Sequence, residues 1–238
     1  MQPEFNPFKY NSFPVNGVRQ SWLLTGVVQG QLLQLRSIGR SERLPPILAF
    51  QSVLDGTVST PAVVRQLFDQ LPANGSELVL FDINRRGVLS PMFTQSANEL
   101  IDQLQPGDAH TYRLTVIGNV DADTANVAER RLEPGQRQAV LRPLPLSYPD
   151  DVYSLSHVAL PFPVDDPLYG LQPRMDEDYG IRIGTMALHG ERGALSVAAE
   201  QLMRLNSNPF YGYLAQRVDE AIVADLPRFE LEHLETPS

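Results

Sequence analysis

The segment Leu44–Pro61, LPPILAFQSVLDGTVSTP, contains the pattern of a strand, a short loop and the beginning of a helix. Its two prolines fix φ and end any preceding helix. The apolar run Ile47–Phe50 is typical of a strand buried on both faces of a sheet. Ser59 and Pro61 mark a helix start, because a hydroxyl residue caps the first turn and proline fits at its beginning. Asp55 therefore follows the carboxyl end of a buried strand, where ligands and chemistry gather in open α/β sheets.

Strands and helices alternate along the rest of the chain. Two buried strands around one amphipathic helix form a βαβ unit, and a repeat of this unit indicates a mostly parallel sheet with flanking helices. The expected strands are 47–54, 77–83, 112–119, 138–144 and 181–188, and the expected helices are 17–37, 60–71, 96–104, 121–132, 193–205 and 210–224. Residues 147–170 hold four prolines without a clear period and are expected to form a long loop. The prediction is one α/β domain, residues 1–226, followed by an acidic tail, residues 227–238.

Composition excludes several classes of function. The net charge of −9 and only 19 Lys and Arg residues argue against nucleic acid or an anionic membrane as a partner. There is no cysteine, and hence no disulfide, thiolate metal site or cysteine nucleophile. No apolar run is long enough to cross a membrane, and the first residues do not form a signal peptide. Without H-E-x-x-H or G-x-G-x-x-G, we expect neither a metal nor a cofactor, and the compartment stays unassigned with the cytoplasm favoured.

His157 is the candidate general base. It lies in the proline-rich loop after the last expected parallel strand, a rigid and partly apolar setting that suits proton transfer. The other three histidines, His110, His189 and His233, are expected to be solvated or structurally bonded. Asp82 ends a strand and is an alternative to Asp55 as the partner acid. The adjacent acids at 150–151 and 165–166 are expected to lie in turns.

Four segments together resemble one family: KYNSFPVN, LPPILAFQSVLDGTVST, ELVLFDINR and SLSHVALPFPVDDPLYG. They are similar to the C-terminal part of bacterial α/β-hydrolases, the serine hydrolases that include lysophospholipases, monoacylglycerol lipases and S33-type aminopeptidases. The resemblance implies an esterase-like activity on a carboxylic ester or lipid. It also implies that Asp55 is the acid and His157 the base of a Ser-His-Asp catalytic triad, within a larger hydrolase domain.

The nucleophile expected from this resemblance is missing. The motif G-x-S-x-G, which precedes the acid in the family, does not occur, and Gly26–Gly30 has valine where serine belongs. We therefore expect a serine hydrolase module whose serine lies outside this chain. The alternative is a non-catalytic α/β scaffold that binds a protein partner. A sheet that begins at the acid strand exposes an edge, so we expect association with a missing N-terminal half or with a second copy, unless the aromatic segment Phe5–Phe13 covers the edge.

Overall fold

The structure, a computed structural model, describes residues 15–104, 107, 109–155, 158–184, 189–190, 194–195 and 205–225. Its helices and strands follow the alternation expected from the sequence as far as β3, with short 3₁₀ turns at Ser41–Arg43, Phe68–Gln70 and Ser90–Met92. The helices are α1 (Val15–Ser37), α2 (Thr60–Gln66), α3 (Gln95–Gln103) and α4 (Tyr211–Asp225). The strands are β1 (Leu48–Ser52), β2 (Glu77–Phe81), β3 (Arg113–Asn119), β4 (Asn126–Leu132) and β5 (Val140–Ser147).

The five strands form one sheet in the order β1-β2-β3-β4-β5. The pairs β1–β2 and β2–β3 are parallel, with α2 and α3 as their crossovers, whereas β3–β4 and β4–β5 are antiparallel. The expectation of an α/β fold is therefore confirmed. The sheet is mixed rather than mostly parallel, because its second half is a meander.

The difference arises at residues 121–132, where the sequence analysis expected a helix. Residues 121–125 form a turn, and Asn126–Leu132 is strand β4, antiparallel to β3. Asp121 accepts a hydrogen bond from the amide of Asp123, and the amide of Val120 donates to the carbonyl of Asn126, which closes the hairpin. Pairing with β3 outweighs the helix propensity of the Ala-Glu-Arg-Arg run. The helical prediction is wrong here, and the second βαβ unit does not exist.

The other predicted elements are confirmed to different extents. Helix α2 is shorter than expected, since it ends at Gln66 and a 3₁₀ turn follows. Residues 181–184 contain no strand, and 185–188 lie outside the described residues. The same holds for most of the expected helix 193–205, for the aromatic segment 5–13 and for the tail 227–238. Residues 148–155 and 158–170 contain no helix or extended strand, as expected for the long loop.

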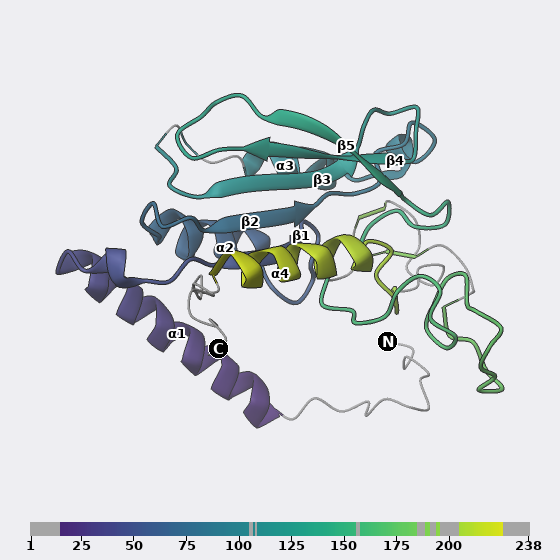
Figure 1. Cartoon of the computed structure of the whole chain (residues 1–238), viewed down its shortest axis with the longest axis horizontal. Coiled ribbons are helices and arrows are strands. Elements are labelled where there is room, and N and C mark those ends of the chain that lie inside the picture. The colour runs from purple at the N-terminus through teal and green to yellow at the C-terminus, as the bar shows by residue number, and fades with distance from the viewer. Residues whose placement is uncertain are drawn as a thin grey trace, which may run out of the picture.

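Each face of the sheet has its own apolar core. Side chains alternate across a strand, so Leu78 and Leu80 of β2 face α2 and α3, whereas Val79 and Phe81 face α4. Strand β2 is buried along its whole length, as expected for a central strand. Figure 1 shows α4 in front of the sheet and α2 and α3 behind it.

Helix α1 extends away from the sheet and leaves most of its apolar surface in water (Figure 1). Leu32 is its only buried residue, and Trp22 is 74% exposed. Two side-chain hydrogen bonds, Gln29 to Gln66 and Arg36 to Gln70, join its C-terminal half to the body of the protein. Among the described residues, no helix has the length and hydropathy that a membrane crossing requires.

Candidate functional site

Asp55 lies where the sequence placed it, on the loop that leaves β1. Its Oδ1 accepts hydrogen bonds from the amides of Thr57 (2.8 Å) and Val58 (2.9 Å), and the side chain is half-buried. Ser59 has the extended backbone of an N-cap, but its side chain makes no capping bond. Instead the buried Thr60 hydroxyl donates to the carbonyl of Ser52 (2.9 Å) and ties the helix start to the strand end. The carboxylate is thus fixed through one of its oxygens.

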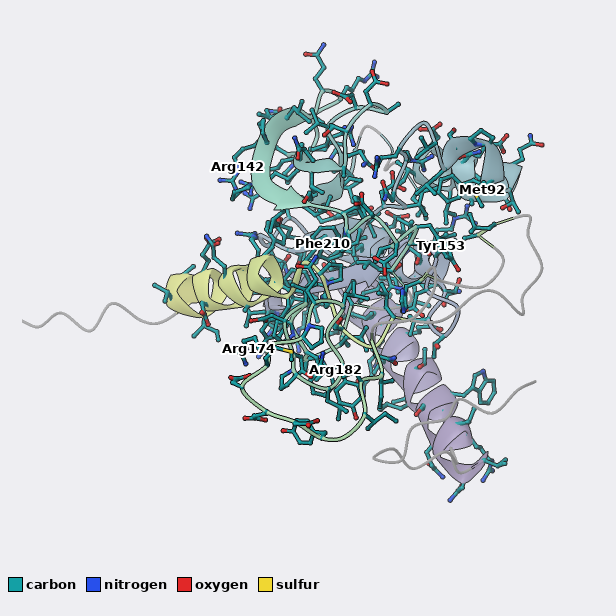
Figure 2. The ribbon with its side chains drawn as sticks, turned by 90° about the vertical axis from the view of Figure 1, so that its right-hand side faces the viewer. Met92, Arg142, Tyr153, Arg174, Arg182 and Phe210 are labelled. Atoms are coloured by element: carbon teal, nitrogen blue, oxygen red, sulfur yellow. The ribbon has the colours of Figure 1, made fainter. Side chains whose placement is uncertain are left out.

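Residues 152–155 cross the carboxyl ends of β2 and β1. Asn84, just after β2, donates through its amide N–H to the carbonyl of Tyr153 and through Nδ2 to that of Val152, both at 2.9 Å. The buried hydroxyl of Ser52, at the end of β1, donates to the carbonyl of Leu155 (2.7 Å). Tyr153 is fully buried among the central side chains (Figure 2). The loop is therefore fixed to the strand ends at three points.

His157 itself lies outside the described residues. Its described neighbours are well packed, since Leu155 and Val158 are both buried in the core on the α4 side. Asn208 donates through Nδ2 to the carbonyl of Val158 (3.1 Å). The segment is therefore fixed on both sides of the predicted base, while the distance between His157 and Asp55 stays a prediction.

Asp82, the alternative acid, is held in an ion pair. Arg85 donates to both of its carboxylate oxygens, at 2.6 Å and 3.0 Å, and the amide of Ile83 donates to Oδ1. Burial raises the pKa of the Asp82 carboxyl above its usual value, although the Arg85 guanidinium acts in the opposite direction. Its side chain faces α3, whereas Leu155 and Val158 pack on the α4 side. Which of the two acids is the partner of His157 stays a prediction.

An acid–histidine pair that the sequence analysis did not anticipate joins Asp151 and His189. The ring Nδ1 of the buried His189 lies 3.3 Å from Oδ2 of Asp151, without the alignment of a hydrogen bond. The amide of His189 donates to the carbonyl of Asp151, and that of Tyr153 to the carbonyl of His189. Burial lowers the pKa of the His189 imidazole, and the Asp151 carboxylate opposes this shift. The ring is closed off from solvent, so His189 holds the loop rather than contacting a substrate.

His110, Asp150 and Asp166 have structural roles, as the sequence suggested. Both ring nitrogens of His110 lie within hydrogen-bond distance of backbone carbonyls, whereas His233 lies outside the described residues. Asp166 accepts hydrogen bonds from two turn amides, and Asp150 pairs with Arg86 at 2.8 Å. The described residues contain no group of three metal-ligating side chains.

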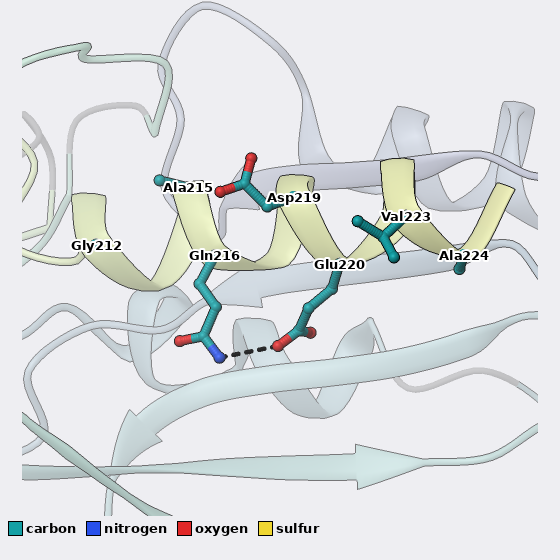
Figure 3. Close-up of a pocket in the computed structure, with 7 residues that line it drawn as sticks. All are labelled: Gly212, Ala215, Gln216, Asp219, Glu220, Val223 and Ala224. Carbon is teal, nitrogen blue, oxygen red and sulfur yellow. Dashed lines mark hydrogen bonds between the residues drawn. The ribbon is translucent and has the colours of Figure 1, made fainter. Parts of the chain in front are cut away.

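A shallow hollow of about 750 Å³ lies along α4, as Figure 3 shows. All of its lining residues belong to this helix, and Gln216 donates to Glu220 within it (2.8 Å). Neither Asp55 nor Asp82, the two predicted site residues that the structure describes, lines this hollow. The hollow is therefore not the candidate site, which lies at the carboxyl ends of β1 and β2.

Comparison with known proteins identifies no family for this chain. No family model matches the chain, and neither a curated protein nor a solved structure is similar enough to it to count as a relative. The functional argument therefore depends on the residues themselves.

Proposed function

We propose that the chain is the acid-and-histidine module of a serine hydrolase that acts on carboxylic esters. Asp55 is the acid, His157 is the base, and the serine is supplied from outside this chain. The observation that carries the proposal is the hydrogen bond from the Ser52 hydroxyl to the carbonyl of Leu155 (2.7 Å). This bond joins the end of the acid-bearing strand to the loop that contains the histidine.

The contacts of Asp55 and the distance along the chain from Leu155 to His157 support this pairing. The amide of Asp55 donates to the carbonyl of Ser52 (3.2 Å), so the acid and the anchoring serine share one turn. His157 follows Leu155 by two positions in the sequence, and an extended chain covers at most about 3.6 Å per residue, or about 7 Å here. Among the described residues, hydrogen bonds engage Oδ1 of Asp55 only. Its Oδ2 is then available to the imidazole.

The chemistry assigned to the pair is that of a triad. The carboxylate accepts a hydrogen bond from Nδ1–H of the imidazole, which keeps the proton on Nδ1 and leaves Nε2 as the base. That nitrogen takes the proton of the serine hydroxyl as its oxygen attacks the ester carbonyl, and then delivers the proton to the leaving alkoxide. The ester or lipid substrate enters at the strand ends.

The second candidate function is a scaffold that binds a protein partner. The apolar surface of α1 favours it, since contiguous apolar surface marks interaction sites. In the described part of the chain β1 pairs with β2 only, so its other edge is open for a further strand. The open edge of β1 also suits the hydrolase proposal, because a segment that brings the serine needs a place to dock beside β1.

The first prediction concerns the proton on the imidazole of His157. In the wild-type chain, nitrogen NMR of the ring should show the proton on Nδ1, because a carboxylate accepts it. Asp55→Asn should move the proton to Nε2, because an amide does not replace the carboxylate as its acceptor. Asp82→Asn is the matched control and should leave the tautomer unchanged. An unchanged tautomer in Asp55→Asn would reject Asp55, and a change in Asp82→Asn alone would select Asp82.

The second prediction concerns the missing nucleophile. The 238-residue chain should hydrolyse p-nitrophenyl acetate no faster than buffer does, and a fluorophosphonate probe should label none of its serines. The reason is that a triad without its serine retains only a small part of its catalysis. Mass spectrometry of the treated protein measures labelling directly. One labelled serine would identify a nucleophile inside the chain and would contradict the assignment of the serine to another segment.

A further inference from the structure

A second cavity, of about 400 Å³, lies on the α3 side of the sheet. Alternate residues of β3 and β4 form its floor, α3 forms one wall and the connection between β4 and β5 forms another. The lining residues are Asp82, Arg85, Asn98, Ile101, Asp102, Leu114, Val116, Arg130, Leu132, Arg137 and Ala139. Neither Asp55 nor any of the described residues 152–155 and 158 contributes to it, so this part of the proposed site does not line the cavity.

One end of the cavity is polar and has Arg130 within it. Asp82 beside it is 3% exposed and is already paired with Arg85. Within the part of the chain that the structure describes, the guanidinium of Arg130 donates one hydrogen bond, from Nη2 to the carbonyl of Asn119 (2.8 Å). An arginine carries five N–H donors, so the group retains donors for a ligand.

Gly118 of β3 makes room for this polar end. A Cβ at Gly118 would lie 3.3 Å from Cβ of Asp82 and 3.4 Å from Nη1 of Arg130. These distances are at or below the lower limit of ordinary van der Waals contact. A residue larger than glycine would therefore displace the side chain of Asp82 or of Arg130. The glycine thus permits the close approach of these two charged side chains over β3.

The charge of the lining selects the sign of the ligand. Three arginines and two aspartates line the cavity, which leaves one net positive charge in a chain whose net charge is −9. Asp82 is paired with Arg85, so within the described residues Arg130 is the arginine at the polar end that belongs to no ion pair. A ligand with one negative charge balances the positive charge of Arg130. A dianion such as a phosphate monoester would carry a second negative charge, which Asp102 would repel.

Most of the other lining residues are apolar and suit a ligand with a hydrocarbon group. Ile101, Leu114, Val116, Leu132 and Ala139 provide an apolar floor and walls. We propose that this cavity binds a small monocarboxylate, with the carboxylate on the fork of Arg130 and a hydrocarbon body over β3 and β4. Arginine presents two parallel N–H donors that match a carboxylate, and burial of the hydrocarbon body adds the hydrophobic contribution. This inference does not depend on the proposed hydrolase function.

Titration of the full chain with hexanoate, monitored by NMR, tests the proposal. Hexanoate should shift the amide signals of Gly118 and Ala139, while hexylamine, with the same body and the opposite charge, should not. Arg130→Gln should weaken hexanoate binding at least about tenfold, because a charge-assisted bidentate contact is lost. Arg142→Gln is the control, since Arg142 pairs with Glu129, which faces α4, and it should bind as the wild type does.

A second variant covers the case in which Arg130→Gln does not fold. Gly118→Ala keeps every charge and narrows the polar end, so it should also weaken hexanoate binding. Equal binding of hexanoate and hexylamine would overturn the proposal. So would wild-type affinity in either variant, or shifts confined to residues that do not line the cavity.

Discussion

Replacing Glu77 with alanine is expected to lower the free energy of unfolding by about 3–5 kcal/mol, the loss typical of breaking a buried ion pair from one side. The Glu77 side chain is 5% exposed and faces α4. It accepts hydrogen bonds from Arg217 of α4 (2.6 Å), Arg113 (3.2 Å) and Thr115 (2.7 Å). Its removal leaves Arg217 largely buried with only Glu220, nearer the surface, as a charged partner. Helix α4 then loses its main polar attachment to the sheet.

Urea denaturation followed by far-UV circular dichroism measures this loss. The only tryptophan, Trp22, lies exposed on α1, so its fluorescence would report poorly on the core. Glu133→Ala is the control, because Glu133 pairs with Arg113 at the surface and exposed pairs contribute less than about 1 kcal/mol. A loss in Glu77→Ala no larger than in this control would show that α4 is held by its apolar face alone.

The first half of the fold could be predicted because each signal in it is local. The apolar runs before Asp55 and Asp82 are continuous, and Pro61 marks where α2 starts. Strand β2 is buried along its whole length as expected, whereas β1 lies at the edge of the sheet and is only half-buried over Leu48–Phe50. The second half could not, because β4 is stabilised by pairing across the sheet. In β4, Val127 is buried and Glu129 is paired with Arg142 of β5. Neither the burial of Val127 nor this ion pair leaves a periodic signal in the sequence.

The candidate site likewise has one part that the sequence could predict and one part that it could not. The position of Asp55 follows from local turn chemistry, and the structure keeps it on that loop. The bond from Ser52 to Leu155 joins residues 103 positions apart, and the pair of Asp151 and His189 depends on a loop without regular structure. Such contacts are decided by tertiary packing, which a single sequence does not encode in a readable pattern. The sequence therefore allowed the candidate residues to be named, but not the tertiary contacts that fix their loops in place.

A large loss of stability is also expected when the apolar ring of Phe210 is removed. Its fully buried ring stacks on Phe81 (5.7 Å between centroids) and meets Tyr148 edge-on (5.0 Å). Phe210→Ala should lower the free energy of unfolding by about 3–5 kcal/mol, through lost burial and the cavity left behind. Phe68→Ala is a matched control, because Phe68 is equally buried but lies on the opposite face, against Tyr112. Urea denaturation should give losses of similar size for both variants.

The two variants should differ at the candidate site. The amide of Phe210 donates to Oδ1 of Asn208, and Nδ2 of Asn208 donates to the carbonyl of Val158, next to His157. Truncating Phe210 removes the packing that fixes this chain of contacts, so the methyl NMR signals of Val158 should shift or broaden under native conditions. Phe68→Ala should leave them in place. Equal changes in both variants would mean that the loop responds to overall stability, and unchanged signals in Phe210→Ala would mean that Asn208 is held without the ring.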